Sequence, residues 1–187
     1  HPHGDPRKAY RDGKLKFDFG TDCEGCLEIT ELKVKDNSGK TVLEICAGPN
    51  GQLWVKENCL QAIDNRELCF ERTEGPGGIV TWTAFVKDCP WEKVFTFTLD
   101  TKGNNMGEFD FCLYKPLEHP DNNGYPYDNH GDDGKGSFED NFKFDFTVRA
   151  TDGDGDKVDA NVCISVDDDS PDACKVDISL CDANNKL

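Results

Sequence analysis

The chain has 187 residues, of which 36% are hydrophobic and 10% aromatic, so it can bury a core and is too apolar for wholesale disorder. Its formal net charge of −16 argues against nucleic acid and anionic membrane surfaces as partners, because both repel an acidic protein. No run of about eighteen apolar residues occurs, so no membrane-spanning segment is expected.

Period-two alternation of apolar and polar residues runs through most of the sequence and predicts β-strands. In chain order, the expected strands are residues 14–20, 27–36, 40–46, 52–57, 67–73, 79–87, 93–100, 107–115, 141–150, 157–166 and 174–181. Turn signals such as DNSG, GPNG and EGPGG separate them. This pattern predicts an all-β fold, an immunoglobulin-like or Greek-key β-sandwich over residues 1–171, with residues 1–13 as an N-terminal arm.

The cysteines form an even set spread along the whole chain. They are Cys23, Cys26, Cys46, Cys59, Cys69, Cys89, Cys112, Cys163, Cys174 and Cys181. The single C-x-x-C has no second knuckle to complete a zinc site, and no predicted helix supplies the context of a redox motif. We therefore expect disulfide bonds and an oxidising, extracellular compartment, with the connectivity left open.

Residues 116–140, PLEHPDNNGYPYDNHGDDGKGSFED, are rich in Gly, Asn, Asp and Pro and predict a long loop. Aromatic plates and carboxylates on such a loop are typical of a carbohydrate-binding site. The candidate residues for this site are Tyr125, Tyr127, Asp128 and Asp132. A solvated insertion without a ligand explains the same composition.

Two aspartate clusters flank one predicted strand near the end of the chain. Asp152, Asp154 and Asp156 alternate with glycines, and Asp167, Asp168 and Asp169 follow the strand. Calcium takes six to eight oxygen ligands, so several carboxylates aimed at one point suit it. The first cluster imitates half of an EF-hand loop, but Lys157 and Cys163 replace the required Gly and Glu. The pattern predicts either a calcium loop between strands or a polar turn.

Three stretches between residues 93 and 171 carry a resemblance to a known family. They are KVFTFTLDTKGNNMGEFDFCLYKPLEHP, FKFDFTVRATDGDGDKV and CISVDDDSP. Together they resemble the repeat domain of giant bacterial RTX adhesins exported by type I secretion. The resemblance implies a secreted, calcium-stabilised β-sandwich that serves attachment and biofilm formation. It also implies calcium ligation by both aspartate clusters and a structural role for His119.

The chain differs from that family in its cysteine content and in holding a single copy of the repeat, which favours a different mode of assembly. Residues 172–187 supply one more strand, with an apolar face formed by Cys174, Val176, Ile178 and Leu180. Such a strand can close its own sandwich or complete a neighbouring subunit's sheet. The second option predicts copies of the chain joined head to tail in a fibre.

The main expectation is an extracellular structural or adhesive protein without enzymatic activity, because the sequence holds neither G-x-S-x-G nor H-E-x-x-H. A carbohydrate-binding module that recognises surface glycans is one alternative. Another follows from His1, because an N-terminal histidine on a secreted β-sandwich resembles copper monooxygenases. In that case, His1 and either His119 or His130 would bind copper.

Overall fold

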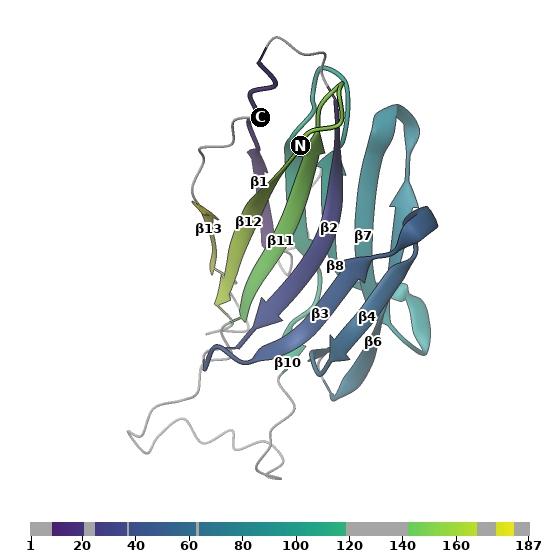
Figure 1. Ribbon diagram of the computed structural model, residues 1–187. Coiled ribbons are helices and arrows are strands. Elements are labelled where there is room, and N and C mark those ends of the chain that lie inside the picture. Colours follow the sequence, from purple (N-terminus) through teal and green to yellow (C-terminus); the bar gives the residue numbers. More distant parts are fainter. Residues whose placement is uncertain are drawn as a thin grey trace, which may run out of the picture.

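Two antiparallel sheets pack face to face and form an all-β sandwich, as the sequence predicts (Figure 1). The computed structural model describes residues 9–20, 25–36, 38–62, 64–118, 142–167 and 175–181, with the backbone alone for residues 9, 118, 167 and 175–181. Within these ranges, no helix is long and apolar enough to cross a membrane.

The seven-stranded sheet lies farther from the viewer in Figure 1, and its strands alternate in direction along the sheet. Its order is β1 (Ala9–Lys14), β9 (Glu108–Leu113), β8 (Cys89–Asp100), β7 (Ile79–Val86), β6 (Arg66–Glu74), β5 (Gln61–Ala62) and β10 (Leu117–Glu118). A 3-10 turn, η2 (Pro76–Gly78), joins β6 to β7. This sheet therefore contains the whole central part of the sequence, together with the first described strand.

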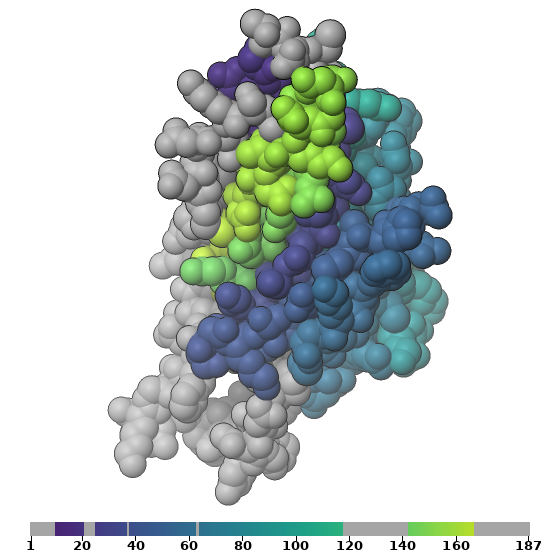
Figure 2. Space-filling view, viewed as in Figure 1, coloured from purple at the N-terminus to yellow at the C-terminus, as the bar shows by residue number. Residues whose placement is uncertain are grey.

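The six-stranded sheet faces the viewer in Figures 1 and 2. Its order is β13 (Lys175–Cys181), β12 (Lys157–Asp167), β11 (Phe142–Thr151), β2 (Cys26–Lys35), β3 (Thr41–Ala47) and β4 (Leu53–Asn58). A second 3-10 turn, η1 (Pro49–Gly51), joins β3 to β4. The edge strands β1 and β13 of the two sheets contact each other, so both described ends of the chain lie along one side of the sandwich.

The core between the sheets combines aliphatic side chains with phenylalanines in F-x-F patterns. Because alternate residues of a strand face the same side, each pattern sends two rings inward. Phe97 of β8 stacks on Phe146 of β11 with ring centroids 3.9 Å apart, and Phe95 meets Phe144 edge-to-face at 5.1 Å. Each buried ring contributes on the order of 1.5–3 kcal/mol, so these pairs hold the two sheets together.

The prediction of a strand at residues 14–20 is wrong. The first strand, β1, covers Ala9–Lys14, most of which was expected to be a free arm. Leu15 leaves the ladder and donates its backbone N–H to the Gly107 carbonyl at 2.9 Å, while its side chain and that of Phe19 are buried. The apolar residues after β1 therefore cover the core without forming a strand, although they alternate with the two-residue period of a strand.

Only the beginning of the predicted long loop falls within the described residues. Leu117 and Glu118 form β10, which pairs with Ala62 and Gln61 of β5. Residues 119–141 lie outside the described part of the chain, and they contain the predicted carbohydrate-binding residues and the two histidines considered for copper. His1 also lies outside it.

Candidate metal site

The turn between β11 and β12, residues 152–156, carries the first predicted aspartate cluster. The backbone N–H of Asp152 donates to the Asp156 carbonyl at 3.0 Å and closes the turn. Gly155 has a φ of +99°, which L side chains rarely adopt, so this position requires glycine. The turn lies at one end of the sandwich, where it forms the lime-green surface at the upper end of Figure 2.

Asp152 organises this turn through one carboxylate oxygen. Its Oδ1 accepts the backbone N–H groups of Asp154, Gly155 and Asp156 at 3.2, 2.9 and 2.8 Å. A side-chain hydrogen bond with Asp154, followed by these backbone bonds, holds the pKa of Asp152 below its usual value, although burial acts to raise it. The carboxylate of Asp152 is therefore ionised and fixed in orientation at neutral pH.

The three aspartates of the turn bring their carboxylates together. One oxygen each from Asp152, Asp154 and Asp156 lies within 4.8 Å of the others, with Asp152 buried and the other two exposed. Oδ1 of Asp152 is held by backbone N–H groups, and the exposed carboxylates of Asp154 and Asp156 lie beside it. These donors are all hard oxygens, open to water on one side, so the set fits calcium better than a soft metal.

The second aspartate cluster lies at the opposite end of β12. Val166, next to Asp167, pairs with Phe142 at the start of β11, and the Asp152 turn follows the end of that strand. Eleven residues of β12 separate the two ends, which corresponds to about 33 Å. The two clusters therefore cannot share an ion. Asp168 and Asp169 lie outside the described residues, as does the Asp167 side chain.

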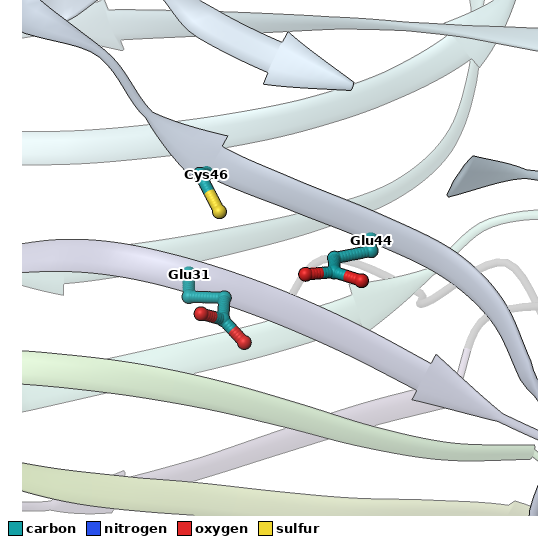
Figure 3. A group of neighbouring side chains, drawn as sticks. All are labelled: Glu31, Glu44 and Cys46. Atoms are coloured by element: carbon teal, nitrogen blue, oxygen red, sulfur yellow. The ribbon is translucent and has the colours of Figure 1, made fainter. Parts of the chain in front are cut away.

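A second group of possible metal ligands lies on the outer face of the six-stranded sheet. Glu31 of β2 and Glu44 and Cys46 of β3 place one ligand atom each within 4.8 Å of the others (Figure 3). This group has no contiguous sequence signal, because its members come from two strands. Only the pairing of Glu31 with Cys46 brings them together.

Lys33 occupies the position of a cation within this second group. Its Nζ lies 3.1 Å from Oε1 of Glu31, and it pairs across the strands with Glu44. The pKa of Lys33 is raised by its hydrogen bond to Glu31 and then by the charges of Glu31, Glu44 and Cys46. The ammonium group of Lys33 therefore already neutralises Glu31, and Lys56 lies 3.9 Å from Glu44.

A third acidic pair lies on the outer face of the seven-stranded sheet and likewise has no contiguous sequence signal. Asp12 of β1 stands directly opposite Asp110 of β9. Burial, and then the charge of Asp12, raise the pKa of Asp110. Like charges opposite each other destabilise a sheet, so this pair weakens the attachment of β1.

The disulfide prediction receives no support from the described residues. No two of the described cysteine side chains lie at disulfide distance, because the register places other residues opposite them. Cys46 faces Glu31 and Trp54, for example. The described cysteine side chains are those of Cys26, Cys46, Cys59, Cys69, Cys89, Cys112 and Cys163. Cys23 and Cys174 lie outside the described residues, and Cys181 is described by its backbone alone.

The predicted C-terminal strand exists as β13. In the single chain it pairs antiparallel with β12, from Lys175 opposite Asp167 to Cys181 opposite Asn161. The backbone positions of Val176, Ile178 and Leu180 are described, whereas Cys174 lies outside. This pairing matches the option in which the strand closes its own sandwich, and donation to a neighbour stays a prediction.

Comparisons with known proteins identify no relative. No protein-family model, no curated protein and no solved structure matches this chain. The resemblance to RTX adhesin repeats therefore stays a prediction from sequence motifs.

Proposed function

We propose that this chain is an extracellular structural or adhesive protein without enzymatic activity, a calcium-stabilised β-sandwich of a bacterial surface fibre or adhesin. The sandwich fold and the aspartate turn agree with what the resemblance to RTX adhesin repeats implies. In this proposal the ion has a structural role. It binds at the end of the sandwich and stabilises the β11–β12 hairpin.

The observation that carries the proposal is the geometry of the Asp152 turn. Three carboxylates converge within 4.8 Å. A side-chain hydrogen bond with Asp154 and backbone hydrogen bonds lower the pKa of Asp152, although burial acts to raise it. Backbone N–H groups orient the carboxylate but carry only partial charge, so a divalent cation would add to the neutralisation of the cluster.

Thermal unfolding with and without calcium tests the proposal. An ion that binds the native state alone raises stability with its free concentration, so EDTA should lower the melting temperature of the full chain by several degrees. Asp154→Ala should remove most of that difference, whereas Glu44→Ala should keep it. The calcium assignment would be refuted if EDTA left the melting temperature of the wild type unchanged and Asp154→Ala melted at the same temperature as the wild type.

We further propose that copies of the chain assemble head to tail by exchange of β13. The support is its place in the fold, since β13 is an edge strand that follows the sandwich domain and pairs with β12. The ladder that it forms in one chain can form equally with β12 of a neighbour. The contribution of the apolar face of β13 stays a prediction from sequence, because the structure describes this strand by its backbone alone.

Deletion of residues 172–187 tests this assembly. We expect the full-length protein with calcium to form filaments visible by electron microscopy, and the truncated chain to form none. A peptide of residues 172–187 should bind the truncated chain. A full-length protein that stays monomeric at high concentration with calcium present would contradict the fibre and leave the single adhesin module.

A further inference from the structure

Gly25 packs directly against the strand that leads into the Asp152 turn. A Cβ atom at position 25 would lie 1.5 Å from the Thr151 carbonyl oxygen and 2.7 Å from the Asp152 Cα, whereas real Cβ contacts are essentially never closer than 3.0 Å. The φ of Gly25 is not in the left-handed region, so lack of space alone excludes a side chain. The backbone of residue 25 and the turn therefore cannot move independently.

The residues after Gly25 join this contact to the other sheet. Cys26 pairs with Thr151 as β2 begins, and Leu27 donates its backbone N–H to the Thr101 carbonyl at 2.9 Å. Thr101 directly follows β8 of the seven-stranded sheet, and it is buried. The Leu27–Thr101 hydrogen bond thus links the two sheets at the end of the sandwich that carries the Asp152 turn.

We infer that Gly25 couples the order of the Asp152 turn to the hydrogen bond between the sheets at Leu27 and Thr101. Tightly packed backbone transmits displacement, and a coupling between two sites acts equally in both directions. A ligand that orders the turn therefore also closes this end of the sandwich. That the ligand is calcium rests on the proposed function, whereas the coupling itself rests on the contact.

Amide hydrogen exchange of the full-length protein tests the coupling. With calcium in place of EDTA, the wild type should show slower exchange at Gly155 and Asp156, and exchange at Leu27 should slow by about tenfold. In Gly25→Ala, exchange at Leu27 should no longer respond. Gly48→Ala is the matched control, because its Cβ would meet the Trp54 ring at 2.8 Å. This contact lies between β3 and β4, at the edge of the sheet away from β12. This variant should respond as the wild type does.

A second arm works without calcium. In EDTA, Gly25→Ala should exchange faster than the wild type at Gly155 and Asp156, by about tenfold. Gly48→Ala should leave these two amides unchanged. If calcium slows none of the turn amides of the wild type, the proposed function fails, and the EDTA arm alone decides the coupling. Equal exchange rates at the turn amides of Gly25→Ala and Gly48→Ala in EDTA would overturn the coupling.

If Gly25→Ala does not fold, the coupling can be tested in the reverse direction, by perturbing the turn and measuring amide exchange at Leu27. Gly155→Ala strains the turn, because its φ is +99° and nothing lies within 4 Å of the added Cβ. In EDTA, this variant should accelerate exchange at Leu27. Gly39→Ala has a comparable φ of +82° and an equally open Cβ, but it lies in the β2–β3 turn. Equal exchange at Leu27 in these two variants would also overturn the coupling.

Discussion

The Asp152 turn and the Glu31 group present the same kind of ligand cluster in two different settings. In each, three ligand atoms lie within 4.8 Å of one another. The Glu31 group lies on adjacent strands, where Lys33 is 3.1 Å from Glu31 and neutralises it. The Asp152 turn is held by backbone N–H groups, which fix the carboxylate of Asp152 without balancing the charge of the cluster.

The difference follows from secondary structure. On a strand, residues two apart share a face, so Lys33 can lie beside Glu31 and opposite Glu44. In a five-residue turn, Oδ1 of Asp152 points inward to the backbone and the other carboxylates lie exposed around it. We therefore propose a solvent cation at the turn, whereas on the sheet Lys33 already lies beside Glu31.

Removing one carboxylate from each group should give the largest difference. Asp152→Ala deprives three backbone N–H groups of their acceptor, so its melting temperature should fall by several degrees even without calcium. Glu44→Ala removes a long contact to Lys56, 3.9 Å apart, and a solvent-screened attraction to Lys33, and should change the free energy of unfolding by less than about 0.5 kcal/mol. Equal losses in thermal unfolding would remove the distinction between the groups.

Acid should weaken the turn selectively. The pKa of Asp152 is lower in the folded chain than in the unfolded chain, so its contribution is present above the usual aspartate value of about 3.9. The contribution is lost as pH falls through the folded value. Melting temperatures measured between about pH 2 and pH 6 should therefore drop less steeply for Asp152→Asn than for the wild type. An identical slope in both proteins would contradict the assignment.

Removing the lysine should make the Glu31 group behave like the turn. Lys33→Gln should lose about 0.5 kcal/mol at low salt and less at high salt, because surface ion pairs are screened. Calcium should then raise the melting temperature of this variant more than that of the wild type. Lys35→Gln, on the same strand, is the matched control. If calcium affects Lys33→Gln and Lys35→Gln equally, Lys33 is not the cation of this group.

The Asp12–Asp110 pair should give the smallest effect, with the opposite sign. The pKa of Asp110 is raised, so its ionisation at neutral pH disfavours folding, and Asp110→Asn should stabilise the chain by about 0.3 kcal/mol after solvent screening. The gain should disappear below about pH 4, where Asp110 is protonated in the folded and in the unfolded chain. Chemical denaturation at two pH values measures it. A loss of stability at neutral pH would show that the Asp110 charge is compensated.

The sequence could predict features that depend on neighbouring residues. Alternating phenylalanines defined the inner faces of β8, β9 and β11, where Phe95, Phe111 and Phe144 are buried. The DGDGD run defined a turn with converging carboxylates because its glycines and aspartates are contiguous. Local periodicity and turn chemistry were sufficient for both.

The sequence could not predict features that depend on register. β1 has no apolar alternation, and it is held by its ladder with β9 and by Gly13, which leaves room for the Phe109 ring. The Glu31 group requires the pairing of β2 with β3, and the Gly25 contact requires the pairing of β2 with β11. The described cysteine side chains give the disulfide prediction no support for the same reason, since an even number of cysteines does not place any two of them opposite each other.

Calorimetric titration of calcium into the metal-free full-length protein tests the central claim most directly. The wild type and Glu31→Gln should bind calcium alike, because the carboxylate of Glu31 is already paired with Lys33. Asp154→Asn should lose a binding event or weaken it by at least about tenfold, since calcium depends on ligand charge. The absence of any heat of binding in the wild type would contradict the account. So would undiminished calcium binding in Asp154→Asn together with a loss of calcium binding in Glu31→Gln.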